Sequence, residues 1–535
     1  MRSIIEEIAA SSFGNIVLIV KNQGVETRMS APRRLVHNRK GLLYALYTKL
    51  DNRFSRVESD AFEQTDISAL CESIDVIGVS PVMTKFRDAL TDADCDAIAA
   101  RQVDVFLRFG FRILHGRVLN VARYGIWSYH HGDSHVHRGS TPGFWEVMND
   151  DDVTGSMLQV LTEDLDNGRV IYRSWAPTIN RFSVKKNLNN YYWKTARFVG
   201  RKLAELHRDR AAWAAEAPPD PTPQPYSARL YMTPTNGEMV RVFASLGLRA
   251  VRRIFDKLAY TEGWAVAYRF GARNEFPNAA LYRFKYLVPP SGSIWADPFP
   301  VHVDGKYFVF FEDLIESKGI ASIAAIELRK DGTHGEPITV LERPYHLSYP
   351  FMFEWQGAQY MIPETGGNNA VEIYKCTSFP DVWEKQATLL EANDPCDATI
   401  FEHDGRWWMF VNISAPNVTV NWEELHLYSA DSPLGPWIPH AQNPVKSDVR
   451  NSRPAGKVFR YEGQLMRPAQ DSSRRYGYAT VINRIETLTM HEFREEPVAH
   501  ILPEWDSQVV GTHTLNSVDG LTVIDCVLKR RRLFA

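Results

Sequence analysis

One short phrase recurs five times in the second half of the chain. It combines a small residue, proline and apolar residues, then a turn with glycine, then an apolar or aromatic strand. The copies span Trp295–Asp313, Ser348–Thr365, Cys396–Ile413, Ser452–Asp471 and, more weakly, Gly511–Cys526. Their marker glycines, Gly305, Gly357, Gly405, Gly463 and Gly520, are 52, 48, 58 and 57 residues apart. A β-sheet module repeating at about 50 residues predicts a five-bladed β-propeller, whose closure hides the sheet edges.

The size and charge of the chain exclude several classes of protein. At 535 residues it is too long for one core, so two or three domains are expected. A net charge of −3 gives no reason to predict nucleic-acid binding. The start, Met1–Gly14, carries two glutamates and does not resemble a signal peptide, and no apolar run approaches a membrane span.

The cysteines indicate the compartment. There are five, they are scattered, and they show no metal spacing: Cys71, Cys95, Cys376, Cys396 and Cys526. This pattern suits a reducing environment better than a disulfide scaffold. We therefore expect a cytoplasmic protein.

The first 200 residues alternate between helical and strand patterns. Helices are predicted at Ile4–Ser12 and Leu42–Leu50, and a long one at Tyr192–Glu216; strands are predicted at Gly14–Lys21, Ile74–Val79 and Val103–Arg108. Such alternation predicts an α/β domain with a mostly parallel sheet.

A proline-rich stretch separates the two halves. Ala217–Pro225 holds five prolines in nine residues and predicts a stiff linker. We therefore expect an α/β domain at 1–216, a linker with a helix at 217–280, and the propeller at 281–535. The helix, Gly237–Tyr260, is amphipathic and basic. It could lie on an anionic membrane surface, but packing against its own domain is the favoured interpretation.

In the first half, the segment Tyr124–Ile171 is the richest in side chains that could take part in catalysis or metal binding. It holds His130, His131, Asp133, His135 and His137 within eight residues. Such a cluster could ligate zinc or iron, but the spacing matches no closed site, so no metal is predicted. A polar active-site loop after a strand is the preferred interpretation.

This segment resembles the formyltransferases that use 10-formyltetrahydrofolate, which include sugar N-formyltransferases. The shared markers follow in register: His130, Arg138-Gly139, Pro142, Trp145, Thr154-Gly155 and Leu165–Gly168. The resemblance covers roughly residues 1–200. It implies a 10-formyltetrahydrofolate cofactor and an amine acceptor that attacks the formyl carbon.

The resemblance also implies roles for single residues. His130 would stabilise the oxyanion and Asp166 would manage protons. Ser128 stands where the family has asparagine, and losing one oxyanion donor typically lowers the rate by about 10²–10³. His131 or Asp133 could take over that role. Both belong to the loop near this site, as does Arg138.

A second departure from this family concerns the first strand. The family opens with a β-strand, whereas this chain starts at what corresponds to the following helix. We expect that the first, central strand is missing, through a misassigned start codon or a truncation.

The repeats resemble family 43 glycoside hydrolases and, more closely, the front domain of plant glucosamine inositolphosphorylceramide transferases. The shared phrases are Ala296–Phe299, His346–Phe351, Ile362–Glu364, Asp397–Thr399 and Gly405–Trp408. The resemblance covers about residues 281–535 and implies a central funnel lined by acids.

The hydrolases need a protonated acid and a carboxylate base or nucleophile. By resemblance, Asp297 matches the base, and Asp397 matches a residue that tunes the acid or holds the sugar. Glu364 is the best remaining acid candidate. Arg453 stands where the hydrolases carry their acid; it is expected to depress the pKa of the carboxylates, or to bind a phosphate or carboxylate of a glycan. His513 is also expected to face the funnel.

Three functions are open. The leading one is formyl transfer to an amino sugar, carried on a nucleotide or lipid, in surface-glycan synthesis, with the propeller recognising the glycan. The second is a glycosidase or transglycosylase acting in the funnel through Asp297, Glu364 and Asp397. The third is a glycan-binding or assembly protein without catalysis.

Overall fold

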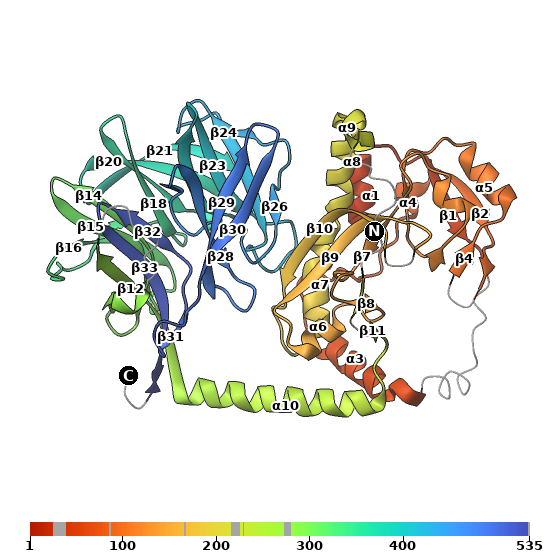
Figure 1. The fold of residues 1–535 in the computed structure, drawn as a ribbon, viewed down its shortest axis with the longest axis horizontal. Coiled ribbons are helices and arrows are strands. Elements are labelled where there is room, and N and C mark those ends of the chain that lie inside the picture. Colours follow the sequence, from red (N-terminus) through yellow and green to blue (C-terminus); the bar gives the residue numbers. More distant parts are fainter. Residues whose placement is uncertain are drawn as a thin grey trace. The chain divides into compact units, whose positions relative to one another are not determined.

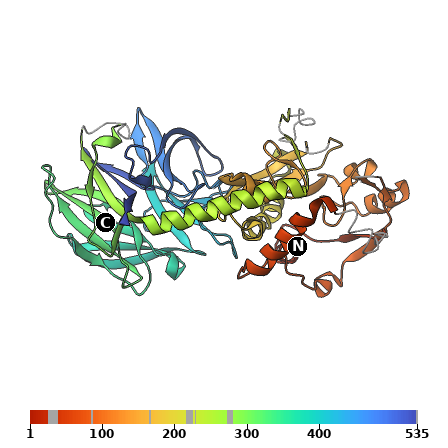
Figure 2. The same cartoon turned by 90° about the horizontal axis from the view of Figure 1, so that it is seen from below.

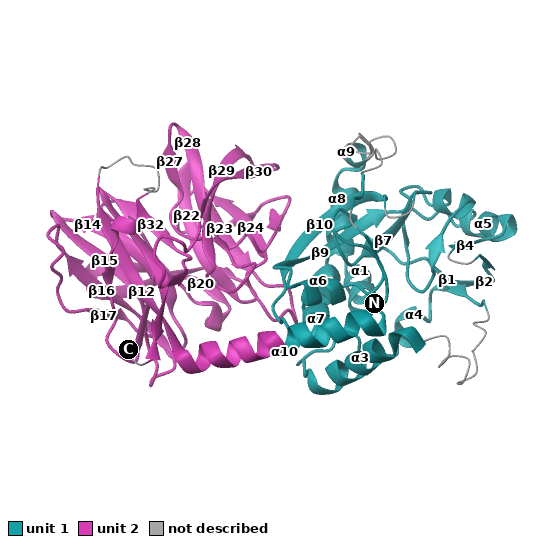
Figure 3. Cartoon of the chain, turned by 60° about the horizontal axis from the view of Figure 1, so that its bottom comes forward, with its two compact units in different colours: residues 1–247 teal, residues 248–535 magenta. Residues whose placement is uncertain are grey.

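The computed structural model describes residues 1–24, 39–84, 87–164, 167–215, 225–227, 229–271 and 280–532. The chain divides into two compact units, Met1–Gly247 and Leu248–Ala535 (Figure 3). This division falls inside α10 (Asn236–Ala259), the long helix seen in Figures 1 and 2. The predicted linker, Ala217–Pro225, lies outside the described residues except for Pro225.

The first unit mixes helices with short strands. Its other helices are α1 (Arg2–Ala9), α3 (Leu42–Phe54), α4 (Ser68–Cys71), α5 (Asp92–Ala99), α6 (Phe144–Asn149), α7 (Val184–Thr195), α8 (Phe198–Arg208) and α9 (Arg210–Ala215). Its strands are β1 (Leu18–Asn22), β2 (Asp75–Val79), β3 (Val82–Met83), β4 (Arg87–Ala89), β5 (Phe106–Leu107), β6 (Ile113–Leu114), β7 (Ile126–His130), β8 (Arg138–Gly139), β9 (Val153–Val160), β10 (Arg169–Pro177) and β11 (Leu230–Tyr231).

The sheets of this unit are smaller and more mixed than the mostly parallel sheet that we predicted. Its largest described sheet has the order β10-β9-β7-β5, in which only β5 and β7 run parallel. A separate parallel pair joins β1 to β2. The core beside the larger sheet gathers Trp127, Leu158 and Phe198 with Ile4 and Ile8 of α1.

Two expected elements differ in detail. The strand predicted at Gly14–Lys21 begins only at Leu18 and is partly exposed. The long helix predicted from Tyr192 is divided among α7, α8 and α9. The chain leaves helical geometry at Asp209, and the following turn stacks Trp213 on Trp127, with ring centroids 5.4 Å apart. Burial of the Trp213 indole stabilises the break between α8 and α9. The local periodicity of the sequence does not reveal this break.

In its described residues, the second unit is all-β apart from the end of α10 and two short 3₁₀ turns. In the described residues its first three sheets are β14 (Ser293–Val303), β15 (Lys306–Ile315), β16 (Ala321–Leu328) and β17 (Ile338–Leu341); β18 (Ser348–Trp355), β19 (Ala358–Glu364), β20 (Ala370–Ser378) and β21 (Val382–Glu391); and β22 (Pro395–His403), β23 (Arg406–Ile413), β24 (Glu424–Ala430) and β25 (Ile438–Pro439), with β26 (Lys446–Ser447). The fourth is β27 (Phe459–Tyr461), β28 (Gln464–Asp471), β29 (Ala479–Leu488) and β30 (Phe493–Ile501). The fifth is β13 (Lys285–Leu287), β12 (Tyr260–Phe270), β33 (Leu521–Arg531) and β31 (Val509–Gly511), with β32 (Leu515–Val518).

These five sheets are the blades of a β-propeller (Figure 1). The ring closes in the fifth blade, where β12 pairs antiparallel with β33 from Tyr260–Arg531 to Phe270–Leu521. The blade therefore takes a strand that lies before residue 281, where we expected the propeller to begin. Sharing one sheet between distant strands leaves no seam in the ring.

The marker glycines sit in the hairpin that follows each inner strand. Asp404 and Gly405, for example, have φ of 52° and 73°, and each of the other four copies also pairs a residue at positive φ with its glycine. Two consecutive positive φ values define the type I′ turn, whose twist matches that of the flanking strands. Each copy of the repeated phrase therefore forms a β-hairpin, with its marker glycine in the turn.

Within the described residues, no helix is both long and apolar enough to cross a membrane.

Candidate functional sites

The inner strands of the first three blades are bulged at the same repeat position. Asp297, Tyr349 and Asp397 each lie eight residues before the marker glycine, at φ of 52°, 41° and 53°. The strand register shifts at each of them, and all three side chains are buried. Positive φ is unfavourable for such residues, so the surrounding structure must impose it. The bulges deliver polar side chains to the centre of the ring.

Arg453 binds two of the predicted acids at that centre. Its Nε donates to Asp397 Oδ2 at 2.5 Å, and its Nη2 donates to Glu364 Oε2 at 2.8 Å. Its Nη1 donates to Asn421 Oδ1 at 3.0 Å, and the guanidinium lies 5.3 Å from the centroid of Tyr476. The Arg453 side chain is buried, so these are charge-assisted contacts away from water.

Glu364 differs from our expectation. We expected Arg453 to depress the pKa of the carboxylates around it, but burial raises the pKa of Glu364 well above its usual range despite Arg453, and Asp397 adds to the rise. The physical reason is stoichiometric. One guanidinium cannot neutralise two buried carboxylates, and Asp397 receives two of its hydrogen bonds. Glu364 therefore retains a proton more readily than a solvated glutamate.

A second group of charges lies around Asp297. Thr514 Oγ1 donates to Asp297 Oδ1 at 2.6 Å, and His513 Nε2 lies 3.3 Å from the same oxygen. His513 Nδ1 lies 2.6 Å from Asp525 Oδ2, in an ion pair. Burial, only partly offset by His513, raises the pKa of Asp297 to about 7. Burial lowers the pKa of His513, but Asp525 and Asp297 outweigh it and raise it to about 9.

We call Asp297, Glu364, Asp397, Arg453, His513 and Asp525 the central cluster. Its members come from β14, β19, β22, the segment bridged to β28, the turn before β32, and β33, so every blade contributes. Four acids face two bases. The two surplus carboxyls, Asp297 and Glu364, are the ones with raised pKa. The cluster therefore favours the protonated form of these two carboxyls, which can donate hydrogen bonds or a proton.

Part of the central cluster also has the composition of a metal site. Ligand atoms of Asp297, His513 and Asp525 lie within 4.8 Å of one another, the one such group found in the described residues. The donor set fits a divalent cation, but the raised pKa of His513 favours the protonated ring, which cannot ligate. Our expectation of no metal stays a prediction.

Sequence reasoning missed several members of this centre. Tyr349 shares the repeat position of Asp297 and Asp397, so the register alone could have found it. Gln470 donates to Asp397 Oδ2 at 2.8 Å. Gln470 lies seven residues after Gly463, the repeat position that Glu364 has after Gly357, so the register could have found it too. No repeat signal marks Asn421, Tyr476 or Asp525.

The predicted N-terminal residues lie around the end of β7. Ser128 and His130 are two residues apart on this strand and share one side of it. Ser128 Oγ is buried and accepts a hydrogen bond from Arg108 Nε at 2.9 Å. Asp166 lies outside the described residues.

Asp133 organises the loop after β7. Its Oδ1 accepts from the backbone N–H of His135 at 3.0 Å, and its Oδ2 accepts from Trp175 Nε1 at 3.3 Å. Arg138 closes the loop by donating from Nε to the carbonyl of Ser134 at 2.8 Å. These bonds occupy Asp133 with the loop, which counts against a direct chemical role for it.

The neighbouring histidines separate. His131 stacks on Tyr192, with ring centroids 3.8 Å apart, and burial, with His130 beside it, lowers the pKa of His131 to about 3. His137 Nε2 pairs with Asp151 Oδ2 at 3.0 Å. Within the described ranges these side chains do not assemble three metal ligands, so the metal alternative for this stretch receives no support.

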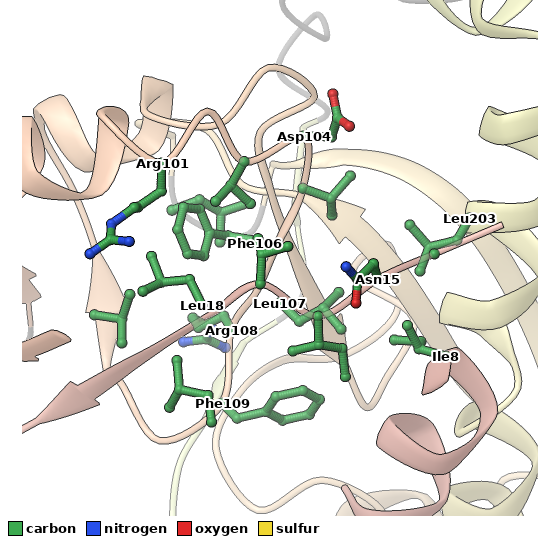
Figure 4. Close-up of a pocket in the computed structure, with 18 of the residues that line it drawn as sticks. Ile8, Asn15, Leu18, Arg101, Asp104, Phe106, Leu107, Arg108, Phe109 and Leu203 are labelled. Carbon is green, nitrogen blue, oxygen red and sulfur yellow. The ribbon is translucent and has the colours of Figure 1, made fainter. Parts of the chain in front are cut away.

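An apolar cavity of about 680 Å³ lies between β1 and β5 (Figure 4). Leu18, Phe106, Leu107 and Phe109 line it, with Arg108 at its wall. In the described residues β1 pairs only with β2, and β5 only with β7.

The strand pairing and the central cluster define a five-bladed propeller with a buried acidic centre, joined to a mixed α/β unit. Residues 287–516 match the family described as "Glucosamine inositolphosphorylceramide transferase 1, N-terminal". The chain is 35% identical over 207 residues to Glucosamine inositolphosphorylceramide transferase 1 of Oryza sativa subsp. japonica, and 32% identical over 207 residues to that of Arabidopsis thaliana. These matches cover 38% of this chain and 28% and 27% of those proteins, so the chain spans little more than a quarter of the relatives' length.

Solved structures are similar at a lower level. Zg3597, a family 117 glycoside hydrolase from Zobellia galactanivorans, is 15% identical, with a TM-score of 0.33 over 49% of this chain and 90% of that one. A point mutant of the family 43 protein BlXynB from Bacillus licheniformis is 14% identical, with a TM-score of 0.33 over 47% and 60%. The propeller assignment rests on the strand pairing and not on these scores.

Proposed function

We propose that this protein is a transferase of glycan or glycolipid synthesis whose propeller recognises an amino sugar. The observation that carries the proposal is the surplus of carboxyls in the central cluster. Asp297 and Glu364 have no full counter-charge of their own, because Arg453 and His513 are paired with Asp397 and Asp525. A sugar ammonium would supply the missing positive charge and would favour ionisation of both carboxyls.

The relatives support this substrate class. Their name pairs glucosamine with inositolphosphorylceramide, an amino sugar with a phosphate-bearing lipid. The acceptor or donor would then be an amino sugar on a nucleotide or a lipid.

The test is calorimetric titration of the whole protein with glucosamine and with the neutral N-acetylglucosamine. We expect glucosamine to bind at least about tenfold more tightly, because a charge-assisted contact is lost on acetylation. Binding should release protons from Asp297 and Glu364, which appears as a dependence of the heat on the buffer. Equal affinity for both sugars would contradict the proposal.

Two variants localise the effect. Asp297→Asn removes one surplus carboxyl and should reduce the preference for glucosamine. Asp313→Asn is the matched control: Asp313 lies in the same blade, burial also raises its pKa, and it accepts from Trp295 Nε1 outside the cluster. A preference that falls equally in both variants would place the sugar elsewhere.

Glycoside cleavage in the funnel is a second candidate, favoured by one observation. A carboxyl whose pKa is raised to about 7, with other carboxyls nearby, resembles the pair of carboxyl groups that glycosidases use. If Asp297 acts in this way, Asp297→Asn should abolish hydrolysis of aryl glycosides while Asp313→Asn retains it. No hydrolysis by the unaltered protein would remove this candidate.

Formyl transfer in the first unit is the third candidate, with 10-formyltetrahydrofolate as cofactor. It is supported by the pairing of Ser128 and His130 on β7 and by the neighbouring cavity, whose volume lies in the range of small-molecule sites. The cofactor would supply the formyl group, Ser128 and His130 would hold the developing oxyanion, and Asp166 would handle protons.

This candidate has a gain-of-function test. Ser128→Asn restores an amide donor and should raise transfer to an amino-sugar nucleotide by about 10²–10³. Binding is read separately: 5-formyltetrahydrofolate at 100 times its dissociation constant should stabilise the protein by about 2.7 kcal/mol. If the variant shows no gain in rate and the folate causes no thermal shift, this unit does no folate chemistry.

A further inference from the structure

The second half of α10 presents an exposed apolar face. Leu248 and Leu258 are each 71% exposed, and Val251, Ile254 and Phe255 are at least 60% exposed. Their spacing places all five on one side of the helix, over an arc wide enough for an apolar stripe. A folded protein seldom leaves such a face in water without using it. The expectation that this helix buries its apolar face against its own domain is wrong for these residues.

The rest of the helix surface is basic. From Leu248 to Ala259 it carries Arg249, Arg252, Arg253 and Lys257 against one acid, Asp256, a net charge of +3. Asp256 is itself paired with Lys529 at 3.0 Å.

A second basic segment lies beside the end of this helix. Tyr260 pairs with Arg531 in the fifth blade, and Arg532 Nε donates to the carbonyl of Tyr260 at 3.2 Å. The pairing brings Lys529–Arg532, four consecutive basic residues, next to the helix. The chain as a whole has a net charge of −3, so this concentration of positive charge is local.

We propose that the α10 face formed by Leu248, Val251, Ile254, Phe255 and Leu258, with the basic residues around it, docks on the surface of an anionic lipid bilayer. A helix with an apolar stripe and basic flanks lies in the plane of the interface, with its apolar side chains among the acyl chains and its cations near lipid phosphates. Charge decides against a second copy of the chain, because self-association through this face would bring two strongly positive surfaces together.

This docking goes beyond the proposed function and does not depend on which sugar is recognised. It would place the protein at the membrane on which a lipid-linked acceptor lies.

The test is co-sedimentation of the full chain with vesicles of phosphatidylcholine alone and of phosphatidylcholine with about one third phosphatidylglycerol. We expect binding to the anionic vesicles and at least about tenfold less to the neutral ones. Raising the salt to 1 M shortens the screening length from about 10 Å to about 3 Å and should release much of the bound protein. Equal binding to both vesicles, or none to either, would overturn the proposal.

Variants separate the two components. Leu248→Gln with Phe255→Gln and Leu258→Gln removes the apolar face and should reduce vesicle binding at least about tenfold, while Arg252→Gln with Lys257→Gln should remove the preference for anionic lipid. These side chains are exposed, so folding should be retained. Ile438→Gln, at an exposed apolar position elsewhere in the propeller, is the matched control and should bind as the unaltered protein does.

Sedimentation velocity without vesicles tests whether a second copy of the chain binds to this face instead. A dimer that the triple glutamine variant converts to a monomer would identify the face as a contact between copies and would overturn the membrane proposal. A monomer in both, with vesicle binding lost only in the variants of α10, is the result that supports it.

Discussion

Two buried histidines, one in each unit, have pKa values that are shifted in opposite directions. His513 in the propeller lies between Asp297 and Asp525, and its pKa is raised to about 9. His131 in the first unit is stacked on Tyr192, and its pKa is lowered to about 3. Burial acts against the charged ring in both places, and only paired carboxylates reverse it. The propeller therefore holds its centre together by charge, and the first unit by ring packing.

The largest effect should come from breaking the charge cluster. Arg453→Met leaves Asp397 and Glu364 buried without their shared cation and should lower the free energy of unfolding by about 3–5 kcal/mol, measured by urea denaturation. Arg2→Met, at the exposed pair with Glu6 in the first unit, should leave the midpoint unchanged. A comparable loss in both variants would break the contrast between the units.

The next effect is a pH dependence. Because the pKa of His513 is raised from 6.5 to about 9, its contribution to stability is complete below pH 6.5 and is lost as the pH rises through 9. This shift corresponds to about 3 kcal/mol. Stability measured between pH 6.5 and 9 should fall steeply in the unaltered protein and remain flatter in His513→Gln. Parallel curves would show that the ion pair with Asp525 does not control this range.

A smaller effect tests the repeated turn. Gly405→Ala places a Cβ at φ of 73°, where the structure has open space, so the conformational strain alone should cost about 1–2 kcal/mol. Gly237→Ala, near the start of α10 and equally unobstructed, should be neutral or slightly stabilising. Thermal unfolding monitored for both variants gives the comparison, and a neutral Gly405→Ala would argue against the type I′ turn.

The smallest effect at neutral pH should come from the stacked histidine. His131→Phe keeps an aromatic ring against Tyr192 and should change stability by less than about 1 kcal/mol at pH 7. Because the pKa of His131 is lowered from 6.5 to about 3, the unaltered protein should lose stability as the pH falls below 6.5, and the variant should lose less. A large loss at pH 7 would mean that a ring nitrogen makes a contact that phenylalanine cannot replace.

The repeat made the propeller predictable, because each of the first four blades is built from contacts close in sequence. The Asp404–Gly405 turn and its counterparts carry their own conformational signal. The closing strand β12 has no such local signal, because its place in the fold is set by its pairing with the distant strand β33. The mixed sheets of the first unit were harder for the same reason: two-residue strands such as β5 are defined by their partners rather than by their own pattern.

The centre of the ring was predictable only where the repeat reaches it. Asp297 and Asp397 occupy one repeat position, and Arg453 was conspicuous as a replacement within the fourth copy. Asn421 lies outside the five copies, and Asp525 lies in the weak fifth copy at a position that no other copy fills with an acid, so both were missed. The direction of the pKa of Glu364 was wrong because it depends on how many buried carboxylates share one guanidinium, which residue identity alone does not give.

The pairing of β12 with β33 also sets an order of events during synthesis. Ala265 and its partner Cys526 are 261 residues apart. At roughly 5–20 residues per second, a ribosome needs roughly 13–52 seconds to travel from one to the other. Throughout that interval the partner strand of β12 is incomplete. The ring can close only when translation of the unit is nearly finished, so blades one to four must wait as an open arc whose exposed edge is the nascent chain's most vulnerable point.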